Sequence, residues 1–282
     1  MDSFVFVAVL FAAACHAGWN ATIKGGGRDP LATTVLISIG AAIVSLVFLP
    51  VTGLPAAAAW PWCATSVLIH LVYFAALIES YRAGDMGQVY PIARGSAPLM
   101  TAVATAAFIG ERLGLLGWCG ILLLAAGVLL LSLRGGRDLA RPDRTAVGFA
   151  LFTAVTICAY SVVDGVGARL SGNANAYSVM LFVGIGPVML IYALARRGHE
   201  VMAAMGQSWG LGLAGGGLQL GSYGIANWAM TVAPIAIVAA LRESSVLFGA
   251  AIAVVFLKEP LRAGRVAAAL MIVAGVALIR LS

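Results

Sequence analysis

Apolar residues gather along this chain into ten long blocks that are separated by short polar connections. A helix needs about 20 mainly apolar residues to cross the hydrocarbon of a bilayer. We therefore predict an all-α membrane protein with ten transmembrane helices around a central cavity, at residues 3–23, 31–51, 60–79, 84–109, 114–133, 147–168, 175–195, 209–230, 233–257 and 262–281.

Composition strengthens this interpretation. Of the residues, 62% are hydrophobic and 10% are charged, and the mean hydropathy of +1.01 exceeds what soluble domains show. The first block ends in His16, Trp19, Asn20 and Lys24 and has no small-residue cleavage site. We therefore expect it to be a retained helix and not a signal peptide.

Basic residues are distributed unequally over the predicted loops. Cytoplasmic loops of membrane proteins carry an excess of positive charge, which predicts a bacterial inner-membrane protein with both termini on the non-cytoplasmic side. Three basic residues fall on the side of the termini: Arg112, Arg169 and Arg280. Twelve fall on the other side: Lys24, Arg28, Arg82, Arg134, Arg137, Arg141, Arg144, Arg196, Arg197, Lys258, Arg262 and Arg265.

The chain also repeats itself. Moving residues 84–133 forward by 148 positions lays them on 232–281 without a gap, so that Arg94 meets Arg242, Glu111 meets Glu259 and Gly127 meets Gly275. We interpret this as an internal duplication with halves 1–139 and 140–282. Because each half holds five predicted spans, the second half is inverted relative to the first, and transporters of this kind bind substrate near the midplane between their halves.

Two stretches at equivalent positions of the halves carry a family resemblance. They read FIGERLGLLGWCGILLLAAGV at 108–128 and FLKEPLRAGRVAAALMIVAGV at 256–276. Each resembles the signature of the EamA-type drug/metabolite transporters, with an acidic residue after the fourth helix and a glycine-bearing fifth helix. The resemblance covers the whole chain and implies an exporter or exchanger of small metabolites. The best-known bacterial members export amino acids, including aromatic ones.

The first helix also resembles one branch of that family, through His16, Trp19, Asn20 and Lys24. The second half departs from this pattern, since Tyr160, Ser161 and Asp164 stand in the corresponding region. We therefore do not expect these positions to play symmetric roles.

A few charged residues fall inside predicted spans, where each needs a partner, a wet cavity or a function. They are Glu79, Arg94, Asp164, Arg242 and Glu243. A guanidinium suits a carboxylate, so one arginine is predicted to contact the carboxylate of an amino-acid-like substrate or a partner that changes during transport. The alternative is a permanent bridge from Arg94 or Arg242 to Glu79, Asp164 or Glu243.

Polar and aromatic residues near these charges are predicted to line an amphipathic pocket. Residues 16, 19 and 20 share one helical face, as do 223 and 227. His16, Asp164 and Glu243 are the candidates for proton coupling, although His16 also suits a packing role. The predicted substrate-binding residues are His16, Trp19, Asn20, Tyr81, Tyr90, Arg94, Tyr160, Asp164, Tyr223, Asn227, Arg242 and Glu243.

Two backbone features point to bending or close packing. Pro91 lies inside the fourth predicted helix, where a proline removes a hydrogen bond and kinks the helix. The eighth predicted helix is rich in glycine, and Gly217 and Gly221 form a small-residue repeat suited to close helix packing. A hinge, or a broken helix that opens onto a cavity, is the alternative interpretation.

Other classes of function fit less well. The chain has no phosphate loop, HExxH or GxSxG motif, so we predict neither an enzyme nor a cofactor or metal site. Its positive charge is that of membrane loops, so no nucleic-acid partner is expected. We predict a monomer in the lipid bilayer that exports small organic metabolites by alternating access. Nucleotide-related compounds, hydrophobic drugs, a channel or a lipid-moving protein remain alternatives. The scattered Cys15, Cys63, Cys119 and Cys158 are expected to be packing residues.

Overall fold

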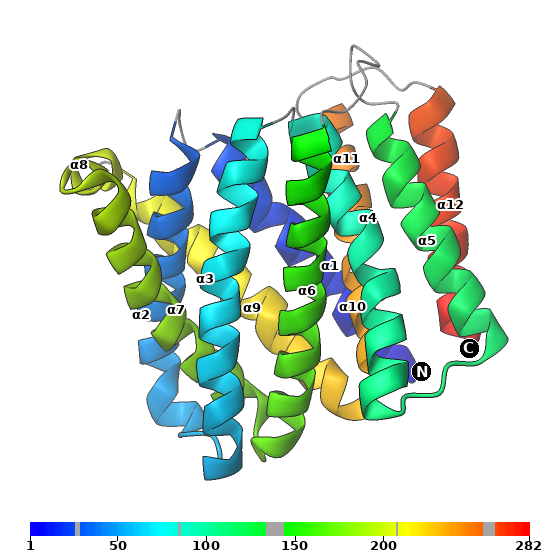
Figure 1. Ribbon diagram of the computed structural model, residues 1–282. Coiled ribbons are helices and arrows are strands. Elements are labelled where there is room, and N and C mark those ends of the chain that lie inside the picture. Colours follow the sequence, from blue (N-terminus) through cyan, green and yellow to red (C-terminus); the bar gives the residue numbers. More distant parts are fainter. Residues whose placement is uncertain (26–28, 84–85, 134–143, 207, 256–262) are drawn as a thin grey trace. The chain divides into compact units, whose positions relative to one another are not determined.

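The computed structural model describes residues 1–25, 29–83, 86–133, 144–206, 208–255 and 263–282, in which every regular element is helical (Figure 1). A 3₁₀ turn, Ala57–Ala59, precedes α3, and a π-helical turn, Thr105–Ile109, follows α4. The helices are α1 (Ser3–Gly25), α2 (Pro30–Thr52), α3 (Trp60–Ala83), α4 (Met86–Ala104), α5 (Leu115–Leu133), α6 (Arg144–Leu170), α7 (Ala174–Arg197), α8 (Glu200–Met205), α9 (Trp209–Val232), α10 (Ile235–Arg242), α11 (Ser245–Val255) and α12 (Ala263–Leu281).

Most of these helices match the predicted spans closely. Eight segments of the described chain are long and apolar enough to cross a membrane, and Leu115–Leu131 in α5 is a shorter apolar stretch. The predicted all-α membrane class is therefore confirmed. The long helix outside this set is α9, which spans 24 residues but carries polar residues and many glycines. The short helix α8 was not expected.

The predicted span at 233–257 is matched by the candidate membrane segment Ile235–Ile252, but its helix is interrupted between α10 and α11. At the break, the amide of Glu243 donates to Ala240 O at 3.0 Å and the amide of Ser244 donates to Leu241 O at 3.0 Å. The Ser244 hydroxyl also donates to Leu241 O, at 2.6 Å. Bonds to the third preceding residue thus replace the α-helical pattern, and the serine side chain competes for a backbone carbonyl.

The chain forms two compact units. Unit 1 comprises residues 1–13, 73–162 and 233–282, and unit 2 comprises residues 14–72 and 163–232. Each unit therefore draws segments from both predicted halves, and α1, α3 and α6 each contribute a part to both. The division of the sequence into halves 1–139 and 140–282 stays a prediction about the repeat.

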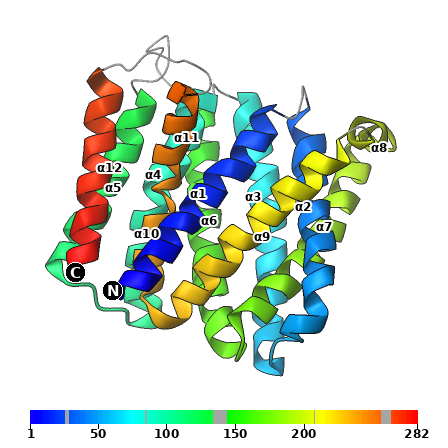
Figure 2. The same ribbon diagram turned by 180° about the vertical axis from the view of Figure 1, so that it is seen from behind.

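In unit 1, α5 and α12 lie side by side (Figures 1 and 2). A Cβ placed on Gly275 would lie 2.7 Å from Leu124 N and 2.8 Å from Gly120 O. A Cβ on Gly127 would lie 2.9 Å from the amide nitrogen of residue 272 and 3.0 Å from the carbonyl of residue 268. Residues 127, 124 and 120 correspond to residues 275, 272 and 268 under the shift of 148 positions. Each helix therefore packs its glycine against the equivalent backbone atoms of the other helix.

Glu111, the acidic residue of the first signature stretch, caps the start of α10. Its Oε1 accepts a hydrogen bond from the Ile235 amide at 2.8 Å, and its Oε2 accepts one from the Ala236 amide at 3.3 Å. Pro234, the residue at the N-cap position, gives no side-chain cap. Glu111 therefore satisfies amides that the helix leaves open and places negative charge at the positive end of its dipole. The second signature acid, Glu259, lies outside the described residues.

In unit 2, α9 packs closely against α2 through glycine (Figure 2). A Cβ on Gly216 would overlap the backbone of Gly40 and Ala41, and one on Gly212 would lie 2.6 Å from Leu36 Cγ. At Gly217 and Gly221 no heavy atom of the described chain lies within 4 Å of an added Cβ, apart from neighbouring backbone of α9 itself. The prediction that these two glycines mediate close packing is wrong, because they lie on another face of the same helix.

Replacement of Glu111 by Ala is expected to lower the free energy of unfolding by about 1.5–3 kcal/mol, because two helix amides lose a charged acceptor. Replacement by Gln keeps one good acceptor and is expected to cost about half as much. Unfolding of the purified variants in mixed micelles measures both values. An alanine variant as stable as the wild type would contradict the capping role.

Replacement of Gly216 by Ala is expected to destabilise the protein by about 1–3 kcal/mol, because the new methyl group meets rigid backbone of α2. The adjacent Gly217→Ala is the matched control, and it should be neutral or stabilising by up to about 1 kcal/mol, since alanine favours the helix. The same unfolding assay compares them. Equal stabilities of the two variants would show that α2 and α9 do not approach as described.

Candidate functional site

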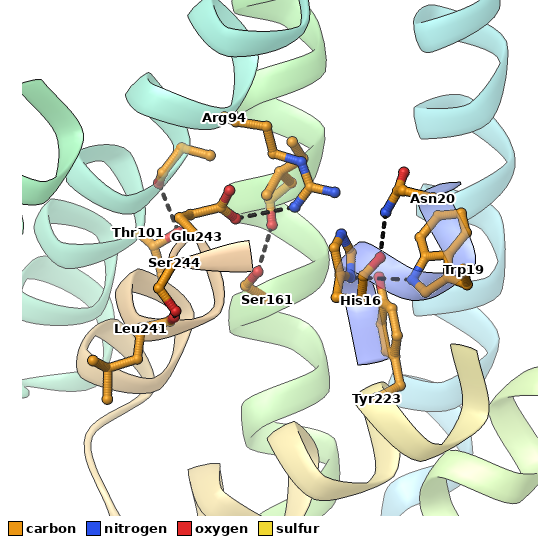
Figure 3. A network of polar contacts seen from close by, with 12 residues as sticks. His16, Trp19, Asn20, Arg94, Thr101, Ser161, Tyr223, Leu241, Glu243 and Ser244 are labelled. Atoms are coloured by element: carbon orange, nitrogen blue, oxygen red, sulfur yellow. Dashed lines mark hydrogen bonds and ion pairs between the residues drawn. The ribbon is translucent and has the colours of Figure 1, made fainter. Parts of the chain in front are cut away.

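An ion pair lies buried in unit 1, between α4 and the break that follows α10. Arg94 Nη1 lies 3.1 Å from Glu243 Oε1 (Figure 3), and the two side chains are 2% and 5% exposed. Among the partners considered for Arg94, the structure therefore shows Glu243. A buried pair gains little net stability over well-packed apolar residues, because both charges lose their hydration.

A small cavity adjoins this pair. Its volume is about 10 Å³, which is about enough for one water molecule. Thr101, Tyr160, Ser161, Arg242 and Glu243 supply its polar lining, and all five are buried. Its remaining lining residues are Ala97, Pro98, Ile157 and Ala239.

The two arginines at equivalent positions of the repeat thus both lie near the carboxylate of Glu243. Arg94 bonds Glu243, and Arg242 lines the cavity together with Glu243. Arg242 is the last residue of α10 and Glu243 is the first residue of the turn that follows, and both lie beside this cavity. A guanidinium that holds a carboxylate of the protein is equipped to hold the carboxylate of a ligand in its place.

Unit 2 contains a second group of buried polar residues. The Tyr177 hydroxyl donates to Asp164 Oδ1 at 2.9 Å, and His70 Nε2 lies 3.2 Å from the Tyr223 hydroxyl. His70 Nδ1 lies 3.2 Å from Ser66 Oγ. Sequence reasoning missed His70, although a histidine inside an apolar block and four residues after a serine was a usable signal.

The other predicted site residues of unit 2 form hydrogen bonds within that unit. Trp19 Nε1 donates to His16 Nδ1 at 3.3 Å, and Asn20 Nδ2 donates to His16 O at 2.7 Å (Figure 3). These contacts agree with a shared face of the first helix. On α9, Asn227 Nδ2 donates to Ser178 Oγ at 3.0 Å.

The predicted site residues are thus divided between the units. Unit 1 holds Arg94, Tyr160, Arg242 and Glu243, and unit 2 holds His16, Trp19, Asn20, Asp164, Tyr223 and Asn227. The side chains of Tyr81, Tyr90 and Pro91 lie outside the described residues. One shared pocket for the whole set stays a prediction. The four cysteines carry free thiols. Cys63 is buried as expected for a packing residue, Cys15 and Cys158 are partly buried, and Cys119 is exposed.

A comparison with known protein families finds a match for the first part of the chain. The model of the EamA-like transporter family matches residues 3–133. Those residues are similar to the EamA-like transporter family. The resemblance found in the signature stretch at 108–128 is therefore confirmed, and Glu111 of that stretch is the residue that caps α10.

Two further similarities accompany the family match. An uncharacterized transporter encoded in the cobO 3′ region of Sinorhizobium sp. is 36% identical over 85 residues, which are 30% of this chain and 50% of that relative. The match thus spans about half the length of the curated relative. A protein of known crystal structure shares the fold with a TM-score of 0.73 at 19% identity, covering 99% of this chain and 96% of that one.

Arg94→Met alone is expected to lower the free energy of unfolding by about 3–5 kcal/mol, because Glu243 loses its buried cation. The double variant Arg94→Met, Glu243→Met is expected to recover most of that stability, since methionine adapts to irregular spaces. Unfolding of both variants in mixed micelles measures the difference. No recovery in the double variant would indicate that the pair holds the bundle together and has no separate role.

Proposed function

We propose that the protein is a secondary transporter that exports small organic metabolites across the bacterial inner membrane by alternating access. The family of residues 3–133 and the transporter relative support this assignment. The apolar helices of membrane length support a place in the lipid bilayer. We propose that a single copy of the chain is sufficient for transport.

The proposed architecture is ten membrane helices in two inverted halves. The equivalent contacts on both sides of the α5–α12 interface support it, because two inverted copies produce such an interface when they pair. A contact between the chain ends in unit 1 supports an even number of spans. There, Arg280 Nη1 donates to Met1 O at 2.6 Å. Both ends are proposed to lie on the non-cytoplasmic side, following the basic residues of the loops.

The proposed substrates are amino acids, with aromatic and hydrophobic ones preferred. One observation carries this class, which is the buried Arg94–Glu243 pair beside a small cavity with both polar and apolar lining. Glu243 presents to Arg94 the group that every amino acid carries, and a substrate carboxylate is proposed to take its place during transport. Tyr160 in the cavity wall offers an aromatic surface for an apolar side chain.

Flux measurements in liposomes test this proposal. The purified protein is expected to give saturable flux of labelled Phe, Trp, Met or Thr, and none of phenethylamine, which lacks the carboxylate. Arg94→Lys keeps the positive charge but loses the two-pronged donor, so it should reduce flux about tenfold or more. Arg197→Lys, in the exposed bridge to Asp29, is the matched control and should leave flux unchanged.

Flux of phenethylamine equal to that of Phe would exclude recognition through the carboxylate. An absence of flux for every amino acid, from protein shown to be folded, would contradict the amino-acid class. A panel of nucleotide-linked and drug-like compounds then distinguishes another substrate class from a protein that carries no small molecule.

A further inference from the structure

A groove with apolar walls runs between α1, α11 and α12 in unit 1 (Figure 2). Its volume is about 560 Å³, which falls within the range of roughly 300–1,000 Å³ that ligand pockets span. Each of the three helices contributes apolar side chains to it, among them Phe6, Leu247 and Val276. We name this feature the α12 groove.

The α12 groove lies at a depth where the surrounding solvent is lipid. Its helices belong to the candidate membrane spans Ser3–Thr22, Ile235–Ile252 and Ala263–Leu281. Val273 and Leu281 in its wall are 54% and 73% exposed, so the groove opens at the protein surface. Water does not fill apolar space of this kind. A molecule that occupies the groove must therefore bring hydrocarbon.

A cation lies at the edge of this apolar wall. Arg280 belongs to the last turn of α12, and its Cζ lies 5.7 Å from the centroid of the Phe6 ring. Its Nη1 donates to Met1 O at 2.6 Å, and its Nη2 donates to Ser3 Oγ at 2.6 Å. Because Phe6 and Arg280 both line the groove, these contacts hold the guanidinium beside it.

The charge of Arg280 is not balanced by the described part of the chain. Both oxygens that accept its hydrogen bonds are uncharged, and no described carboxylate forms an ion pair with it. Asp2, the acid nearest to those oxygens in the sequence, instead accepts the Phe4 amide through Oδ1 at 2.8 Å. A guanidinium has five N–H donors, so three remain for an anion besides the two that are engaged. Phosphate oxygens suit this planar fork.

A purely structural role for Arg280 explains only part of this arrangement. Its two hydrogen bonds fasten the start of α1 to α12, and an uncharged donor would serve for both. The end of a membrane-length helix is where a long basic side chain reaches the level of the lipid head groups. A hydrocarbon groove beside a cation at that level matches an amphiphile with acyl chains and an anionic head group.

We propose that the α12 groove binds an anionic phospholipid of the surrounding bilayer. One acyl chain occupies the groove, and the phosphate contacts Arg280. Ser244, which is 1% exposed, also lines the groove and directly follows Glu243 of the buried ion pair. The bound chain thus reaches the turn that interrupts the helix between α10 and α11. The proposal goes beyond the proposed transport function and requires only a place in the bilayer.

Native mass spectrometry of the purified full-length protein in detergent micelles tests this binding directly. One molecule of dioleoyl phosphatidylglycerol, which carries a net negative charge, is expected to bind about tenfold or more tightly than zwitterionic dioleoyl phosphatidylcholine. Dihexanoyl phosphatidylglycerol has the same head group and much shorter chains. It should bind at least about tenfold more weakly than the dioleoyl form, because it buries less hydrocarbon.

Two variants test the two parts of the site. Arg280→Gln removes the charge and is expected to abolish the preference for phosphatidylglycerol over phosphatidylcholine. Arg112→Gln is its matched control, because Arg112 is exposed, lies outside the groove and is predicted on the same side of the membrane. Ala277→Phe places a ring in the groove and should weaken binding of both dioleoyl lipids about tenfold. Ala267→Phe, at an exposed position of α12 outside the groove, should bind them as the wild type does.

Equal binding of the two dioleoyl lipids to the wild type would overturn the proposal. So would a preference that Arg112→Gln loses as fully as Arg280→Gln, because surface charge would then be the cause. Wild-type binding by Ala277→Phe, which keeps both hydrogen bonds of Arg280, would exclude the groove as the place of the chain. The readout is bound lipid, so failure of amino-acid flux would leave this proposal standing.

Discussion

The structure of unit 1 depends on two charged side chains that are buried in a chain surrounded by lipid. Arg94 and Glu243 are almost fully enclosed, so each depends on the other and on nearby polar atoms for the interactions that water would otherwise supply. The break between α10 and α11 brings Glu243 to this position. A continuous helix would have no turn at Glu243 and Ser244. The buried ion pair therefore depends on the irregular backbone between α10 and α11.

Much of the fold could be predicted because the bilayer itself sets the length of an apolar block. The ends of α2, α7 and α12 lie within a few residues of the predicted spans for this reason. The break at Glu243 could not be predicted in the same way, since it depends on 3₁₀-type bonds and a serine hydroxyl that hydropathy does not register. The packing face of α9 also escaped prediction, because two glycine repeats on one helix differ only in the neighbour that each one meets.

The candidate site was predicted in part, and for different physical reasons in each unit. The charges of Arg94, Arg242 and Glu243 stand out in an apolar sequence, so they were found readily. His70 was missed because its importance comes from Tyr223, which lies 153 positions away along the chain. Partners that meet only in the folded chain leave little trace in local sequence pattern, whereas a repeat at constant spacing leaves a clear one.

The cap by Glu111 holds the first residues of the short helix α10 in place. Eight residues rise about 12 Å, and all eight are buried. One end of this rod is held by Glu111, and the other end carries Arg242 at the cavity wall. A helix of two turns that is capped and buried is short and stiff, so a displacement at one end is expected to move the other end as well. The helix α10 thus connects Glu111, which follows α4, with the buried Arg242, so any displacement of that segment is expected to reach the cavity wall.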